Sequence, residues 1–470
     1  MNKNINVIIF SVFRIICSFL LLYFLSRYLT KYDFGLYNYF IAFSTISLTI
    51  LFNGFTPIYL RNKIITKNKE YKSDQLLYNQ IFFFFLILLF TLNLIYQVIQ
   101  SNIDINIQIK LLNFFLISGF FHHIVLQEVR SQKKFFLLSL ILFLEIFIFL
   151  LIVILIYLNA IKVNIINFYV IFYVLFSILI LIITKNFKRF IFVKIDYSIL
   201  KNFKILIFSY FKNSFSVLNN SLTNYSFLIF IVGLKFSLEK SADVAVAVQI
   251  LSIIVFSVIW VELILPIKYM DLIKNNDVIG FKIFFKNKVT KYFLIIIFFS
   301  TVYIEIFNRT NLIEILFTEK YKKSINEISI LSIVAISQCF EIFISWYLLS
   351  LKKESTLMKI SMLKLIIFLV FLYFGNYELI LLGFALSFVS LFIIGLFLMK
   401  KHMYKSDFYM IIYFYFLFLS WILSSYFMIF NFLSKALLLI LILSCIVYIL
   451  ANIKIYLNEL KKLFNINGNY

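Results

Sequence analysis

Long uninterrupted apolar runs constrain this 470-residue chain more than any other feature of its sequence. A bilayer core about 30 Å thick is crossed by roughly 20 apolar helical residues. Runs of that kind lie near 6–25, 36–60, 80–99, 107–127, 135–158, 165–184, 205–233, 242–267, 291–308, 325–350, 358–374, 379–399, 409–430 and 435–457. Transmembrane barrel strands are shorter and alternate in polarity, so these runs are not strands. The sequence therefore predicts an all-α polytopic membrane protein with about 14 transmembrane helices.

Composition supports a membrane protein and argues against a soluble one. Charged residues make up 14% of the chain, whereas about 25% is usual for soluble proteins. Cys17, Cys339 and Cys445 lie in apolar runs and share no motif spacing, so we expect neither a disulfide framework nor a metal site. The first run carries Arg14 and lacks a small-residue cleavage site, which indicates a retained helix and not a signal peptide. We expect no cofactor and no enzymatic group.

The distribution of Lys and Arg predicts the orientation of the chain. With the N-terminus in the cytoplasm, the cytoplasmic segments hold 30 of the 44 Lys and Arg residues and the opposite loops hold 10. Cytoplasmic loops carry such an excess of positive charge, so both termini are predicted to be cytoplasmic. Anionic lipid attracts the same residues, which explains most of the net charge of +23 without nucleic acid.

The two prolines of the chain, Pro57 and Pro266, indicate an internal repeat. Gly35 precedes Pro57 by 22 residues, and Ala245 precedes Pro266 by 21. A coincidence between two prolines is the alternative. The repeat predicts two six-helix lobes in the same orientation around a central cavity, as in other transporters with parallel repeats. The predicted parts are an N-lobe at 1–184, a cytoplasmic linker at 185–204, a C-lobe at 205–399, and two further helices with a cytoplasmic tail at 400–470.

Three stretches resemble one family of transporters. They are "LTKYDFGLYNYF" at 29–40, "FNGFTPIYLRNK" at 52–63, and the region at 307–360 with its "LKKEST" turn. They are similar to polysaccharide (O-antigen, Wzx-type) flippases of the multidrug/oligosaccharidyl-lipid/polysaccharide exporter superfamily. One departure is Ala245, where a glycine is expected in the second lobe.

The resemblance implies a function in the synthesis of lipopolysaccharide O-antigen or capsule. Its substrate would be an oligosaccharide linked to undecaprenyl pyrophosphate. The flippase would move this lipid across the bacterial inner membrane by alternating access, in the company of other polysaccharide assembly proteins.

The tripeptide Asp-Phe-Gly at 33–35 is also the magnesium-binding tripeptide of protein kinases, but no other kinase motif accompanies it. We expect Asp33 to lie in an external turn and Gly35 to let the chain re-enter the bilayer. The tyrosines at 32, 37 and 39 are expected to form an interfacial aromatic anchor.

Two cations lie inside predicted spans, where an ionisable residue usually faces a cavity or a partner. Arg14 is halfway along the first span, and Lys212 lies in the seventh. A helix from 205 to 233 would place Lys212 on one face with a polar stripe, namely Asn213, Ser216, Asn219, Asn220, Thr223 and Asn224. In the resembled family spans 1 and 7 line the cavity, where such groups suit pyrophosphate and sugar hydroxyls.

Structural alternatives exist for both cations. Arg14 could snorkel or pair with a neighbouring helix, and the stripe could be a polar seam between helices. Residues 201–214 could instead form a helix lying at the membrane surface.

Three intramembrane acids, Glu145, Glu262 and Glu341, are candidates for coupling transport to a proton or sodium gradient. Glu262 lies four residues before Pro266, where the helix is loosened, although pairing with a cation is an equal alternative. Pairing between Glu341 and Lys364 is the alternative that we favour for that acid. A fourth acid, Glu305, is expected near the outer interface and in contact with water.

Adjacent histidines mark the inner end of the run at 107–127. His122 and His123 point about 100° apart on a helix, so they do not easily chelate one metal ion. Anchoring at the interface or a helix contact is one interpretation, and a proton relay is the other.

Two other functions were weighed against a flippase. A cation-coupled multidrug exporter of the same superfamily is disfavoured by Arg14 and Lys212, because many of its substrates are cations. A membrane O-antigen polymerase is expected to carry a large external loop, and the longest external loop here is 309–324.

Overall fold

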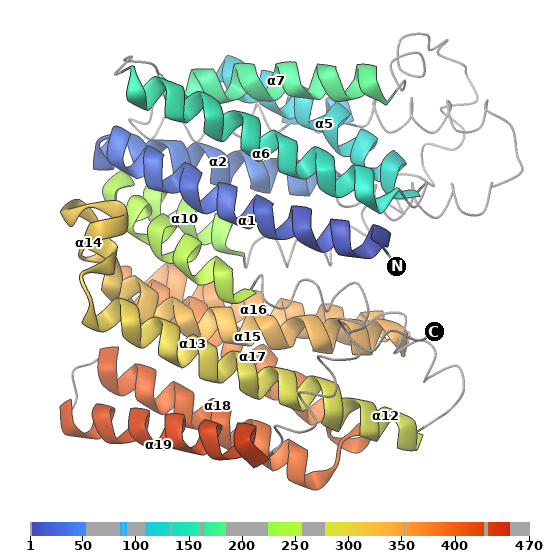
Figure 1. Ribbon diagram of the computed structural model, residues 1–470, viewed down its shortest axis with the longest axis vertical. Coiled ribbons are helices and arrows are strands. Elements are labelled where there is room, and N and C mark those ends of the chain that lie inside the picture. Colours follow the sequence, from blue (N-terminus) through green and yellow to red (C-terminus); the bar gives the residue numbers. More distant parts are fainter. Residues whose placement is uncertain are drawn as a thin grey trace, which may run out of the picture. The chain divides into compact units, whose positions relative to one another are not determined.

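The computed structural model describes residues 2–52, 85–87, 89–91, 109–131, 134–159, 164–184, 224–255, 278–351, 353–426 and 431–451. Within these residues every regular element is a helix (Figure 1). Seven of the described helices are long and apolar enough to cross a membrane: Phe136–Leu158, Ile165–Ile183, Lys291–Arg309, Ser324–Ser345, Ser355–Phe374, Tyr377–His402 and Lys405–Tyr426. The predicted class, an all-helical multi-pass membrane protein, is confirmed. Most of the run at 80–99 lies outside the described residues.

The chain divides into two compact units. Unit 1 comprises Met1–Val246 and Leu316–Tyr321, and unit 2 comprises Ala247–Ile315 and Lys322–Tyr470. The predicted linker at 185–204 lies outside the described residues. Residues 224–246, which the repeat assigned to the second lobe, are part of unit 1.

Unit 1 is a bundle with an aromatic core. Its helices are α1 (Asn2–Tyr28), α2 (Lys31–Phe52), α5 (Ile109–Ser131), α6 (Phe135–Leu158), α7 (Ile165–Ile183), α10 (Tyr225–Lys235) and the first part of a helix over 238–255. Helix α1 packs along α6, α5 along α7, and α2 along α10 and α5. Rings fill the core: Phe115 stacks on Tyr173 with centroids 4.5 Å apart, and Phe85 lies 4.6 Å from Phe120.

Asparagine side chains cap the N-termini of three helices. The side-chain oxygen of Asn164 accepts hydrogen bonds from the backbone amides of Ile166 and Asn167 in α7, and Asn376 accepts one from Leu379 in α17. Asn224 does the same for α10, through a 2.8 Å bond from the amide of Phe227. These bonds satisfy amides that have no partner within the helix.

The stretch at 29–40 differs from the sequence-based expectation. Asp33 lies in the first turn of α2, where its amide donates to Thr30 Oγ1 (3.1 Å) and its carboxylate accepts from that hydroxyl (2.6 Å). This reciprocal pair caps the helix. Gly35 is inside the helix, and a Cβ there would overlap the backbone carbonyl of Leu238. The glycine therefore serves close helix packing and not a turn.

The expected aromatic anchor is also wrong in two of its three members. Tyr32 is exposed, but Tyr37 and Tyr39 are buried in unit 1, against Tyr169 and Phe230 respectively. Because α2 is enclosed by other helices, aromatic residues one and two turns into it contribute to the core.

Unit 2 is organised around α15. Its elements are α12 (Val278–Phe284), the π-helical η1 (Phe285–Thr290), α13 (Lys291–Arg309), α14 (Leu312–Phe317, which ends in unit 1), α15 (Ser324–Ser350), α16 (Glu354–Phe374), α17 (Tyr377–Met399), η3 (Lys400–His402), α18 (Lys405–Tyr426) and α19 (Asn431–Ala451). The 3₁₀ turn η2 (Glu319–Tyr321) belongs to unit 1. Helix α15 contacts α13, α16, α17 and α18. Small buried residues such as Ser332, Ala335 and Ser337 allow this close packing.

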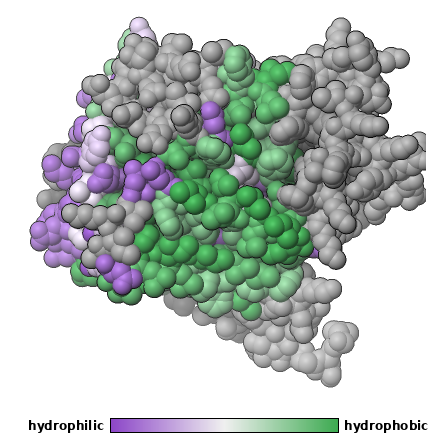
Figure 2. All heavy atoms as spheres, turned by 90° about the horizontal axis from the view of Figure 1, so that it is seen from above, coloured by the Kyte–Doolittle hydropathy of each residue, from purple (hydrophilic) through white to green (hydrophobic). Residues whose placement is uncertain are grey.

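The outer surface fits a lipid environment. On the face shown in Figure 2, apolar residues form a broad continuous area and polar residues gather at one end. Along α7, Ile171, Leu175 and Ile182 are each more than half exposed. A soluble protein rarely exposes an apolar surface of this extent.

Candidate functional site

Three ionisable side chains from different helices meet inside unit 1. Arg14 comes from the middle of α1, His122 from α5 and Glu145 from the middle of α6. Nε2 of His122 lies 3.6 Å from Oε2 of Glu145, and Arg14 is within electrostatic reach of both residues. We call Arg14, His122 and Glu145 the polar triad. Close packing of α1 on α6 and of α5 on α6 brings them together.

Aromatic rings hold the imidazole of His122 in place. It stacks on Tyr173 of α7 with centroids 5.3 Å apart and an interplanar angle of 23°, and it also lies near Phe176. The side chain is buried, and Nδ1 has no hydrogen-bond partner among the described residues. Nε2 therefore faces a carboxylate, while Nδ1 remains available as a hydrogen-bond donor or acceptor.

Only part of the predicted site falls within the described residues. Arg14 and Glu145 lie in the polar triad, although the predictions had not linked them to each other or to His122. Asn224 is the N-cap of α10 and not a residue within a longer helix. Its side-chain oxygen accepts a hydrogen bond from the amide of Phe227, which has no acceptor within the helix. The residues outside the described ranges are Lys212, Asn213, Ser216, Asn219, Asn220, Thr223 and Glu262.

The expected pair between Glu341 and Lys364 is present in unit 2. Nζ of Lys364 lies 3.4 and 3.3 Å from the two carboxylate oxygens of Glu341. The same ammonium lies 3.5 Å from the centroid of the Phe388 ring, and the lysine side chain is 2% exposed. A carboxylate and a ring face thus both stabilise this buried cation. The exposed Arg309 pairs with Glu305 at the end of α13.

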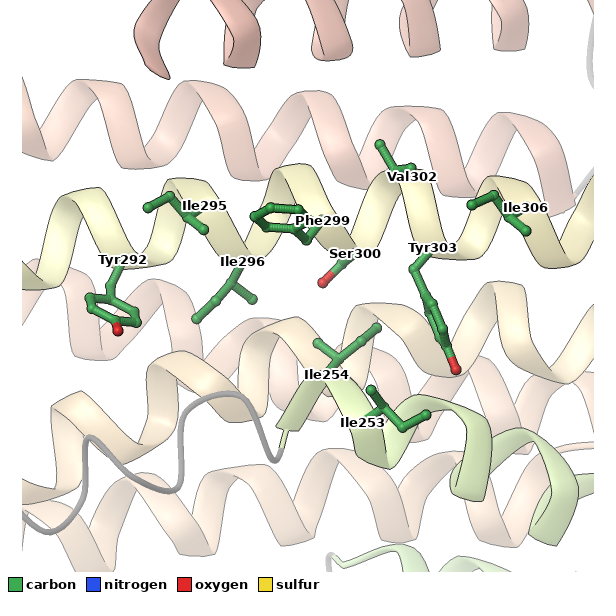
Figure 3. A pocket seen from close by; sticks show the side chains of 10 residues that line it. All are labelled: Ile253, Ile254, Tyr292, Ile295, Ile296, Phe299, Ser300, Val302, Tyr303 and Ile306. Carbon is green, nitrogen blue, oxygen red and sulfur yellow. The ribbon is translucent and has the colours of Figure 1, made fainter. Parts of the chain in front are cut away.

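An apolar pocket of about 500 Å³ lies in unit 2 (Figure 3). Its walls are α13 and the end of the helix over 238–255. The lining residues are Ile253, Ile254, Tyr292, Ile295, Ile296, Phe299, Ser300, Val302, Tyr303 and Ile306. The hydroxyl of Tyr303 donates to the carbonyl of Ile250, so this polar group is already engaged. The pocket suits a hydrocarbon or aromatic group and not a charged one.

Sequence reasoning missed a second polar cluster of unit 1. Nζ of Lys31 lies 2.7 Å from Oδ2 of Asp243, and Lys320 donates to the carbonyl of Leu29 at 2.6 Å. Both lysines had been counted only as loop charges. No signal in the sequence pointed to these contacts, because Lys31 and Asp243 are 212 residues apart and Lys320 and Leu29 are 291 apart. The described residues contain no group of three or more side chains that could hold a metal ion.

Comparison with known proteins identifies the fold. No family model and no curated protein matches the sequence. Among solved structures, an inward-facing multidrug resistance MATE family transporter of the MOP superfamily matches with a TM-score of 0.54 and 13% identity, over 85% of this chain and 98% of that one. The chain has a MATE-like transporter fold.

Two further structures with this fold agree. A Vibrio cholerae MATE transporter mutant matches with a TM-score of 0.51 and 13% identity, over 85% of this chain and 95% of that one. Another MATE mutant gives a TM-score of 0.51 at 14% identity with the same coverage. At 13–14% identity these matches show the fold and give no information on the substrate.

Proposed function

We propose that this protein is a flippase that moves an oligosaccharide linked to undecaprenyl pyrophosphate across the bacterial inner membrane by alternating access. The MATE-like fold over 85% of the chain supports a transporter and not a membrane polymerase. The stretches at 29–40, 52–63 and 307–360 support the polysaccharide branch of the superfamily. The excess of cytoplasmic Lys and Arg supports an orientation with both termini in the cytoplasm.

The depth of Arg14 along α1 is the observation that most strongly supports the proposal. It lies twelve residues from the start of α1, which corresponds to about 18 Å along the helix axis. This distance exceeds the length of an arginine side chain, so snorkelling to the interface does not account for it. A cation at such a depth costs about 2.5–3.5 kcal/mol on insertion scales, so a ligand or an internal partner is required.

Pyrophosphate fits the chemistry of the polar triad. The guanidinium fork of Arg14 matches two phosphate oxygens, and such charge-assisted bonds are the strong ones. Glu145 attracts Arg14 in the structure. Substrate binding to Arg14 would leave the Glu145 carboxylate to His122, whose Nε2 already lies 3.6 Å from its Oε2. This change of partners would link substrate binding to Glu145, the proposed ion-coupling residue.

The test of substrate binding is flipping in proteoliposomes, measured as access of a membrane-impermeant glycosidase to a fluorescent undecaprenyl-pyrophosphate oligosaccharide. Arg14→Ala should slow flipping about tenfold or more, because hydrogen bonds to charged groups contribute roughly 1.5–3 kcal/mol. Arg14→Lys should recover part of the rate. Arg309→Ala is the matched control, since this arginine is exposed and pairs only with Glu305 among the described residues. Wild-type flipping by Arg14→Ala would refute the assignment.

The test of coupling uses Glu145→Gln, which keeps the shape but cannot change charge. A pH gradient should accelerate the wild type and leave the Gln variant unaffected, while exchange without a gradient continues in both. Acceleration by a sodium gradient alone would assign sodium and not protons as the coupling ion.

A cation-coupled multidrug exporter is the second candidate. The uncharged pocket of about 500 Å³ favours it, because Phe299, Tyr292 and Tyr303 offer rings to a lipophilic compound. The matched structure described as a multidrug resistance transporter agrees with this alternative. Efflux of a lipophilic uncharged dye that Phe299→Trp abolishes, with no flipping of the glycolipid, would select this function.

A further inference from the structure

A six-residue segment, Leu316–Tyr321, belongs to unit 1 although the residues on both sides of it belong to unit 2. We call this segment the strap. Its two buried rings are its anchors: Phe317 lies 5.7 Å from Phe19 of α1, and Tyr321 lies 5.5 Å from Phe34 of α2, both edge to face. The strap therefore rests on the second half of α1 and the beginning of α2.

Polar contacts surround these anchors. Lys320 donates to the carbonyl of Leu29, just beyond the last residue of α1, where helix carbonyls lack partners and attract cations. Lys31, at the start of α2, lies 5.8 Å from the centre of the Tyr321 ring and pairs with Asp243 of the helix over 238–255. Three segments that are distant in sequence thus meet at the turn between α1 and α2.

The polar contacts beside the two anchors are weak. Gly35 lets α2 approach the backbone of Leu238, so no side chain interlocks at the closest point. The Lys31–Asp243 pair retains 19% and 7% side-chain exposure, and ion pairs with access to water contribute about 0–1 kcal/mol. The buried rings of Phe317 and Tyr321 are therefore the main hold of the strap on the turn.

The strap also carries backbone strain. Thr318 has a φ of 78°, in the left-handed region that a β-branched residue avoids. Its buried hydroxyl has no hydrogen-bond partner among the described residues. Such a conformation costs about 1–3 kcal/mol and persists only where surrounding contacts impose it. Release of the strap would relieve this strain.

We propose that the strap is a releasable clamp, which holds the α1–α2 turn in the state described here and leaves it during each transport cycle. The clamp acts on the conformational change and so goes beyond the proposed substrate. Lys320 and Tyr321 hold the turn directly, and the Lys31–Asp243 pair holds the start of the helix over 238–255 against the same site.

The test cross-links the strap to the turn. Cys17, Cys339 and Cys445, all buried and unbridged, are replaced by Ser, and Lys31→Cys and Lys320→Cys are introduced together. A short, reducible bifunctional thiol reagent should join them, because both lysine ammonium groups lie within 6 Å of the Tyr321 ring centre, at 5.8 and 5.4 Å. Transport, compared before and after cross-linking, should fall at least tenfold and return on reduction.

The matched control joins two residues beside the strap. Glu314→Cys and Lys322→Cys replace an ion pair of 2.7 Å that lies entirely in unit 2, so their cross-link leaves the strap free to release. It should form and leave transport unchanged. Unimpaired transport by the chain cross-linked between 31 and 320, or no cross-linking there, overturns the proposal.

A substrate-independent measurement separates this proposal from the proposed function. Spin labels at 31 and 320 should give two distance populations whose ratio changes with pH or sodium, even if no glycolipid is flipped by any variant. One unchanging short distance under all conditions overturns the clamp. Absence of flipping by the unmodified protein, with two distances present, overturns only the proposed substrate.

Discussion

Replacement of Gly35 by Ala tests the packing argument at its closest point. In an ordinary helix interior Ala is about 1 kcal/mol more favourable than Gly. At position 35 the new Cβ would overlap the backbone carbonyl of Leu238, which has no rotamer by which to move away. Overpacking of this kind costs about 1–3 kcal/mol. After the gain in helix propensity is subtracted, we expect Gly35→Ala to destabilise the protein by about 1 kcal/mol. The loss reaches about 2 kcal/mol if the overpacking cost is at the top of its range.

Gly119→Ala provides the matched comparison within unit 1. Its Cβ would come 2.6 Å from Cδ2 and 3.0 Å from Cδ1 of Leu48, the far end of a flexible side chain that can rotate aside. Both substitutions gain the same helix propensity, so the difference between the two variants isolates the contact with the carbonyl. We expect Gly119→Ala to be more stable than Gly35→Ala by about 1–3 kcal/mol.

The measurement is equilibrium unfolding of both variants in one detergent, followed by helical circular dichroism and with the wild type alongside. Gly35→Ala should also lower the yield of the cross-link between 31 and 320, because the same contact supports the clamp site. The reasoning is refuted if Gly35→Ala equals or exceeds Gly119→Ala in stability.

Four further predictions follow from single contacts. Glu341→Leu should destabilise by about 3–5 kcal/mol in thermal unfolding, because Lys364 stays buried without its carboxylate, and adding Lys364→Met should recover most of the loss. Thr318→Gly should stabilise the described state by about 1 kcal/mol, since glycine tolerates the positive φ; a lower melting temperature would contradict the strain. Asn224→Ala should cost about 1 kcal/mol and Asn224→Asp almost nothing, whereas a loss of transport in the stable Asp variant would give Asn224 a role in substrate binding. Burial lowers the pKa of Lys320 below its ordinary 10.5, so the unfolded chain binds more protons than the folded one near that pH. The stability of the wild type relative to Lys320→Met should therefore increase as pH rises toward 10.5, and a decrease would refute this sign.

The helices could be predicted from the sequence because the bilayer imposes a length on them. Apolar runs at 135–158, 165–184 and 291–308 coincide closely with Phe135–Leu158, Ile165–Ile183 and Lys291–Arg309. Which side of each helix packs against its neighbours could not be predicted in the same way. Helix α6 is apolar on all sides, so no stripe tells which side meets a neighbour. Glu145 is the one charged residue of α6, and its partner His122 is on another helix.

The prediction that Gly35 lies in a turn was wrong, because glycine serves both tight turns and the close packing of helices. A glycine that follows a loop favours a turn when only its neighbours in sequence are considered. Its use for close approach depends on a segment about 200 residues away, which only the folded chain brings near. The same limit applied to Lys31, whose partner Asp243 is 212 residues distant.

The two helices that meet at this turn contribute different groups to the contact. Asp33 caps its own helix through Thr30, whereas Asp243 of the helix over 238–255 pairs with Lys31. Gly35 gives α2 a surface without a side chain, and the backbone carbonyl of Leu238 lies against it. One helix therefore supplies the surface for close approach and the other supplies the negative charge, so an ion pair accompanies the backbone contact and adds specificity to it.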